Sequence, residues 1–94
     1  MAQSLYGVKM YGEGEKVNSY NEFIASVSIN HIKIYGPIFG WRYGQTFFNM
    51  LRQCNMKMAE SIRNTNLDPY YLEKISEEDH DAIEKIWEEH NDAR

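Results

Sequence analysis

The chain has 94 residues, which is the length of one compact domain, and its 43% hydrophobic and 14% aromatic residues exclude a largely disordered protein. Its formal net charge is −4, and it has no apolar run of the roughly 18 residues that a membrane-spanning helix needs. Its single cysteine, Cys54, excludes an internal disulfide and indicates a reducing compartment.

Two short strands are expected in the first part of the chain. Residues 5–11 alternate large apolar side chains with smaller or polar ones, which is typical of a strand, and a glycine-rich turn follows at 12–15. Residues 31–35 alternate in the same way and predict a second strand. Gly36-Pro37 and Gly40 should end it.

A helix is expected between these strands. Ser19 and Glu22 have the spacing of a capping box, in which each side chain satisfies a backbone amide of the first helical turn. Apolar residues then recur at helical spacing and favour a helix over residues 20–29. A strand is the alternative, because β-branched residues also alternate in this stretch.

The second half of the chain is predicted to be helical. One helix should bury a single face, made of Tyr43, Phe47, Met50, Leu51 and Cys54. Asn55 can cap a short helix that follows, whose inward residues are Met58, Ala59 and Ile62. Asp68-Pro69 is a local helix-start signal, and a single turn should follow it.

A last helix should begin after Ser76. Acidic residues fill its first turn, where the helix dipole favours negative charge. Its apolar stripe consists of Ile83, Ile86 and Trp87. Residues 91–94 are expected to form a frayed end. Together the predicted elements indicate a single α+β domain, with strands and one helix in residues 1–41 and helices in 42–90.

Charge is distributed unevenly along the chain. Residues 1–59 carry a net charge of +3 and residues 60–94 carry −7. The acidic side of the last helix, with Glu84, Glu88 and Glu89, is therefore a candidate contact for a basic partner. The alternative is an ordinary solvated surface. The negative second half also argues against nucleic-acid binding.

Nothing in the sequence indicates catalysis, a metal site or a cofactor. Cys54 has no cysteine partner at metal-binding spacing and lies on the apolar face of its helix, so it is interpreted as an inert thiol. His80 and Glu84 are four residues apart, but two ligands are too few for a zinc site. The glycines do not form a phosphate-binding loop, because bulky residues separate them.

Aromatic residues are concentrated near the middle of the chain and form the main candidate binding site. The residues proposed for contact are Tyr35, Phe39, Trp41, Arg42 and Tyr43. Tyr, Trp and Arg are enriched at the energetic centres of protein interfaces, and aromatic rings with arginines can also bind nucleotides. So many rings in a small domain predict a homo-oligomer with residues 35–41 at or near its contact. The alternative is that these rings form the core.

A structural corner is expected at Asp68, Pro69, Tyr70 and Tyr71. Asp68 should cap the turn, and Arg42 is a possible ion-pair partner that would fasten the corner to the preceding helix. This pairing would explain the two charged residues without a ligand.

The same region carries a resemblance to a known group of proteins. The residues that carry it are Arg42, Gly44, Gln45, Phe48, Asn49, Leu51, Ala59, Ile62, Arg63, Thr65, Asp68, Pro69, Tyr70 and Tyr71. This pattern resembles a group of small bacteriophage and prophage accessory proteins. The resemblance implies a viral or prophage context in the bacterial cytoplasm, and it implies no catalytic residue.

Two functions are consistent with these observations. The first is a non-enzymatic protein that binds and modulates a host protein, through the aromatic segment or the acidic last helix. The second is a small-ligand or nucleotide binder that uses Trp41, Arg42 and the nearby tyrosines.

Overall fold

The computed structural model describes residues 19–92, and within this range every regular element is a helix. The helices are α1 (Tyr20–Asn30), the π-helix η1 (His31–Tyr35), α2 (Tyr43–Cys54), α3 (Met56–Ile62) and α4 (Glu77–Asp92). The α+β prediction is therefore wrong for residues 19–92, which contain no strand. The strand and turn predicted at 5–11 and 12–15 lie outside the described residues.

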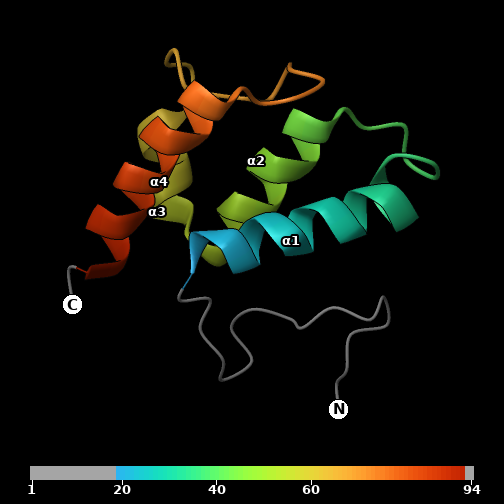
Figure 1. The fold of residues 1–94 in the computed structure, drawn as a ribbon. Coiled ribbons are helices and arrows are strands. Elements are labelled where there is room, and N and C mark those ends of the chain that lie inside the picture. Colours follow the sequence, from blue (N-terminus) through green and yellow to red (C-terminus); the bar gives the residue numbers. More distant parts are fainter. Residues whose placement is uncertain (1–18, 93–94) are drawn as a thin grey trace.

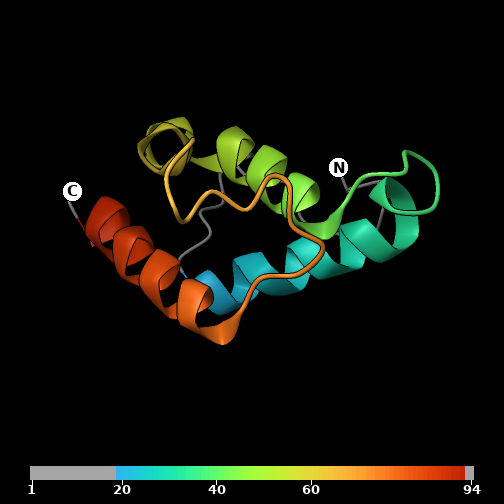
Figure 2. The same cartoon turned by 90° about the horizontal axis from the view of Figure 1, so that it is seen from above.

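The helices pack around one another in two pairs. Helix α1 leads into a turn at one end of the molecule, and α2 returns from this turn and packs on α1 (Figure 1). Helices α3 and α4 lie together at the opposite end from the turn (Figure 1). Seen from above, α1 and α4 diverge from a common corner, and the segment between α3 and α4 passes along α2 before α4 begins (Figure 2).

Helix α1 begins where the capping box predicted. The Ser19 hydroxyl accepts a hydrogen bond from the Glu22 amide at 3.2 Å, which satisfies one of the amides left free at a helix start. Phe23 and Val27 are fully buried. The helical interpretation of residues 20–29 is thus confirmed, and the alternative strand is not formed.

The strand predicted at 31–35 is instead the π-helix η1, which continues α1 without a break. In its backbone, the Gly36 amide donates a hydrogen bond to the His31 carbonyl five residues earlier, at 2.8 Å. A strand needs a neighbouring strand for its backbone groups, whereas a helix satisfies them within itself. Ile32 and Ile34 therefore do not line one face of a sheet, and Ile32 is 71% exposed.

Helix α2 supplies the centre of the core, as its apolar spacing predicted. Phe47 and Leu51 are fully buried, and the other members of the predicted face pack against the core. The Asn55 side chain accepts from the Met58 amide at 3.0 Å and caps α3, as predicted. The inward residues predicted for α3 are buried, namely Met58, Ala59 and Ile62.

Helix α4 closes the core from the other side. It begins after Ser76, whose hydroxyl accepts from the Asp79 amide at 3.1 Å. Ile83 and Trp87 are buried, and Ile86 packs against them. The helix continues to Asp92, which includes the first two residues of the tail predicted at 91–94. Among the described residues, no helix combines the length and apolar character needed to cross a membrane.

Candidate functional site

The corner predicted at residues 68–71 packs directly on the start of α2. The Gly44 amide donates to the Leu72 carbonyl at 2.9 Å. A β-carbon at Gly44 would lie only 1.7 Å from the Pro69 carbonyl oxygen. The absence of a side chain at this position is therefore what allows the 69–72 segment to cross α2 so closely. Pro69 is fully buried at the crossing.

Arg42 fastens this corner, but through a different partner from the one predicted. Its Nε donates to the Tyr70 carbonyl at 3.4 Å. Its guanidinium carbon lies 5.3 Å from the centre of the Tyr71 ring and 6.0 Å from that of Tyr70. No ion pair joins Arg42 to Asp68. Arg42 is therefore held by the Tyr70 carbonyl and by the faces of two tyrosine rings, and the Asp68 carboxylate is not its partner.

Asp68 instead organises the backbone around itself. One carboxylate oxygen accepts from the Asn64 amide at 2.6 Å, and the other accepts from the Tyr70 amide at 3.0 Å. Asn64 has φ of +63°, a left-handed conformation that asparagine tolerates better than most residues. The predicted single turn is present, closed by the Leu72 amide on the Pro69 carbonyl at 2.8 Å.

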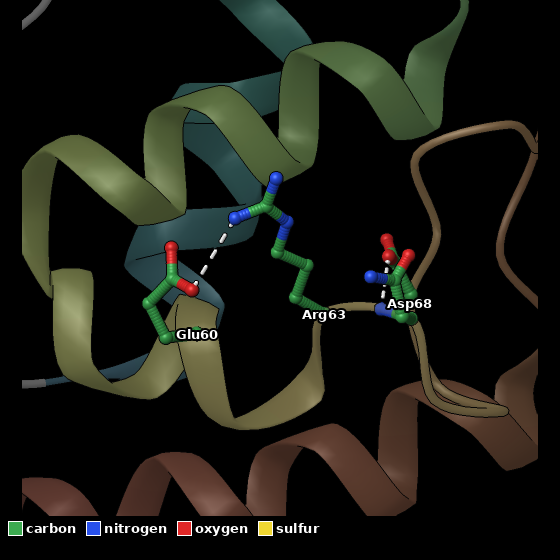
Figure 3. A network of polar contacts seen from close by, with 4 residues as sticks. Glu60, Arg63 and Asp68 are labelled. Atoms are coloured by element: carbon green, nitrogen blue, oxygen red, sulfur yellow. Dashed lines mark hydrogen bonds and ion pairs between the residues drawn. The ribbon is translucent and has the colours of Figure 1, made fainter.

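Between the corner and α2 the surface forms an open groove of about 380 Å³, called here the corner groove. Its lining comes from Phe48, Asn49, Arg52, Arg63, Asn64, Asp68, Tyr70 and Tyr71. Figure 3 shows Arg63 reaching from the end of α3 toward α2, with Glu60 beside it and the Asp68 carboxylate apart from it. Arg63 Nη1 lies 3.4 Å from a Glu60 carboxylate oxygen, in an exposed pair.

The predicted aromatic site forms a second feature, at the turn between η1 and α2. Tyr35 and Trp41 stack with ring centres 4.6 Å apart and an angle of 7° between their planes. Phe39 places its edge against both rings, with centres 5.4 Å from each. Phe39 itself is 55% exposed. Ile38, beside it, is 69% exposed. We call residues 32–41 the aromatic turn.

Tyr43 and Arg42 do not belong to the exposed part of the aromatic turn. Tyr43 is half-buried and packs against the core. Its ring lies edge-on to the His31 ring at 5.5 Å, and its hydroxyl is 3.4 Å from that of Ser28. Arg42 is committed to the corner. The structure therefore divides the five predicted contact residues between a surface turn and internal supports.

The acidic residues of α4 lie on its outer side. Glu88 and Glu89 are exposed and Glu84 is half-buried. Lys85 is exposed among them. Within the described part of the chain, none of these four side chains forms an ion pair, so their charges face solvent.

Cys54 and His80 are the two side chains considered for reactive chemistry, and the surroundings of each restrict it. Burial raises the pKa of the Cys54 thiol to about 12, so the nucleophilic thiolate is scarce at neutral pH. His80 Nδ1 shares a hydrogen bond with the Tyr20 hydroxyl at 2.8 Å, which uses one of its two ring nitrogens. In residues 19–92, no three His, Cys, Asp or Glu side chains lie close enough together to hold a metal ion.

Sequence reasoning missed the polar half of the corner groove. Asn49 and Arg52 follow each other at helical spacing on α2, beside the buried Phe48. Their shared face is visible in the sequence. Its proximity to Arg63 and Asn64 depends on how the chain returns after α3, which no local pattern encodes.

His80 should make stability depend on pH. Burial lowers the pKa of His80 below its ordinary value of 6.5, although neighbouring carboxylates oppose this. The unfolded chain therefore takes up a proton more readily than the folded one. The stabilisation is fully present above about pH 6.5 and is lost as pH falls through the lowered folded pKa. The free energy of unfolding, measured by urea titration between about pH 7.5 and pH 5.5, should decrease as the pH is lowered.

The control is a second histidine on the same helix. His80→Gln should flatten this pH dependence, whereas His90→Gln should leave it steep. Equal slopes in the two variants would contradict the assignment to His80.

Comparisons of the chain with protein families, with curated proteins and with solved structures found no significant match. The candidate sites therefore rest on the geometry described above.

Proposed function

We propose that this protein is a non-enzymatic accessory protein that binds a host protein through the aromatic turn. The observation that carries the proposal is the interlocked stack of Tyr35, Phe39 and Trp41, which supports an exposed apolar surface. The resemblance to phage and prophage accessory proteins supports a bacterial host and the cytoplasm as the place of action.

The exposed side chains of the turn suit a protein interface better than a free surface. Ile32, Ile38 and Phe39 are each more than half exposed, although they lie within ten residues of one another. Large apolar side chains exposed in one short segment are typical of interaction sites. Because the rings already hold each other in place, their side chains would lose little conformational entropy when a partner binds them. The complementary surface is an apolar hollow that accepts Phe39.

The negative charge on α4 also supports binding to a protein. Glu84, Glu88 and Glu89 give α4 a negative face, and none of them forms an ion pair with another described residue. Such a face attracts a partner of net positive charge and accelerates encounter at low salt. It also repels nucleic acid, whose phosphates carry the same sign. The proposed partner is therefore a protein with an apolar pocket and a net positive charge.

The proposal predicts site-specific crosslinking in bacterial cells. A photo-crosslinking amino acid at position 39 should capture one dominant host protein, because Phe39 lies at the proposed contact. The same group at exposed position 74, which is outside the turn, serves as the control. The captured protein, once purified, should bind the wild type and lose at least about tenfold in affinity for Ile38→Ser/Phe39→Ser.

Two results would count against the aromatic turn. One is crosslinking from position 39 that does not exceed crosslinking from position 74. The other is equal binding of the purified partner to the double variant, with its helical circular dichroism unchanged. A crosslink to a second copy of this chain would instead assign the turn to the predicted homo-oligomer, and sedimentation at micromolar concentration would then show more than the 11.1 kDa monomer.

A further inference from the structure

We propose that the corner groove is a binding site for a small organic phosphate that carries a flat ring, of the size of a nucleoside monophosphate. This site lies on α2 and the corner, so it is separate from the aromatic turn and does not depend on the proposed partner. Its volume of about 380 Å³ falls in the range of small-molecule sites.

The anionic part of the ligand is inferred from two arginines that line the groove. Arg52 belongs to α2. Arg63 reaches toward α2 from the end of α3 (Figure 3). Arg52 has no ion-pair partner among the described residues, and Arg63 has only the exposed Glu60. Guanidinium groups bind phosphate oxygens in paired hydrogen bonds. The groove lining thus carries two arginines and one carboxylate, that of Asp68.

The flat ring is inferred from Tyr71 at the edge of the groove. Its side chain is 76% exposed. It is nevertheless fixed, because the Arg42 guanidinium lies 5.3 Å from its centre and the Tyr70 ring meets it edge-on at 5.0 Å. An exposed ring held in one orientation is a ready platform for stacking.

Other polar groups that line the groove suit a sugar and the edge of a base. The Asn49 side chain forms no hydrogen bond with any described residue, so its amide is available. The Asp68 carboxylate accepts two backbone amides and still has acceptor positions for a hydroxyl donor. In Figure 3 this carboxylate stands apart from the Arg63 guanidinium, so the carboxylate beside that arginine is the exposed Glu60.

The groove is also fixed before any ligand arrives. The close crossing at Gly44 and the bond from Gln45 Nε2 to the Tyr70 hydroxyl, at 3.3 Å, hold the corner against α2. Phe48 forms a buried floor beneath it. Little ordering is then required on binding, which favours measurable affinity for a small ligand.

The experiment is a titration of the protein with adenosine monophosphate and uridine monophosphate, followed by amide NMR shifts and calorimetry. Adenosine without phosphate and inorganic phosphate are titrated in parallel. We expect saturable shifts confined to the groove with both nucleotides, and binding at least about tenfold weaker with either fragment.

Single substitutions test which lining residues contribute to nucleotide binding. Arg52→Gln and Arg63→Gln should each weaken nucleotide binding about tenfold, whereas Lys85→Gln, which removes an exposed positive charge on α4, should not. Tyr71→Ala should weaken nucleotides but leave inorganic phosphate unaffected. Glu60→Gln should tighten nucleotide binding by a few-fold, because it removes the carboxylate beside Arg63 that repels the phosphate.

Three outcomes would overturn the site. The first is the absence of saturable shifts at millimolar nucleotide. The second is inorganic phosphate binding as tightly as the nucleotides, which would remove the ring from the ligand. The third is equal weakening by Lys85→Gln and the two groove arginine variants, which would mean that general charge attraction alone is measured.

Discussion

Gly44→Ala should destabilise the protein by about 2–4 kcal/mol, although alanine is the better helix former by about 1 kcal/mol. The added β-carbon would lie 1.7 Å from the Pro69 carbonyl oxygen and 2.8 Å from that of Leu72. Both atoms are backbone, so no side chain can rotate to make room. The corner must move away from α2, which breaks the Gly44–Leu72 hydrogen bond and the contacts of Arg42 with Tyr70.

Urea unfolding followed by far-UV circular dichroism measures this loss. Gln53→Ala is the control, because it adds alanine at an exposed position of the same helix and should change stability by less than about 0.5 kcal/mol. The corner should also lose its fixed geometry, so Gly44→Ala should lower the affinity of the corner groove for any ligand. If Gly44→Ala proves as stable as the wild type, the close crossing is not present in solution.

Phe47→Ala should cost about 3–5 kcal/mol, a large share of the roughly 5–15 kcal/mol that stabilises a domain. Phe47 is fully buried, and its ring meets Tyr20, Phe23 and His80 edge-on at 6.5, 5.3 and 6.2 Å. It therefore joins α1, α2 and α4 in one cluster. Removing the ring leaves a cavity between three helices that are each held by their own hydrogen bonds and cannot fully collapse.

Phe39→Ala is the matched control for this change. It deletes the same atoms from the aromatic turn, where Phe39 is 55% exposed, and should cost less than about 1 kcal/mol. Thermal unfolding of the two variants gives the comparison. Should Phe47→Ala unfold completely, Phe47→Leu, which keeps most of the volume, should remain folded and lose about 1.5 kcal/mol. Equal losses at the two positions would contradict the division into core and surface turn.

The sequence predicted the helical elements well because their signals are local. The Ser19 and Asn55 caps, the apolar face of α2 and the acidic start of α4 each depend on residues within one or two turns. The strand prediction at residues 31–35 was wrong because alternating isoleucines form a strand only where a neighbouring strand can pair with them, and residues 19–92 contain no strand. A helix that is already growing from α1 extends through them at lower cost.

The candidate sites were predicted only in part, for a different reason. The aromatic turn is continuous in the sequence, so its residues were found together. The corner groove joins α2 to residues that follow α3, and the return path of the chain was not predictable. Asp68 was correctly identified as a residue that orders the corner, but its carboxylate is occupied by two amides and never meets Arg42.

The separation between the aromatic turn and the core has a consequence for evolution. Tyr35, Phe39 and Trp41 pack on one another, and the buried core is formed by other residues. Substitutions at Ile38 or Phe39 thus change the outward surface while leaving the helix packing almost untouched. A protein built in this way can follow a changing target by altering a few exposed residues, because its fold places no demand on them.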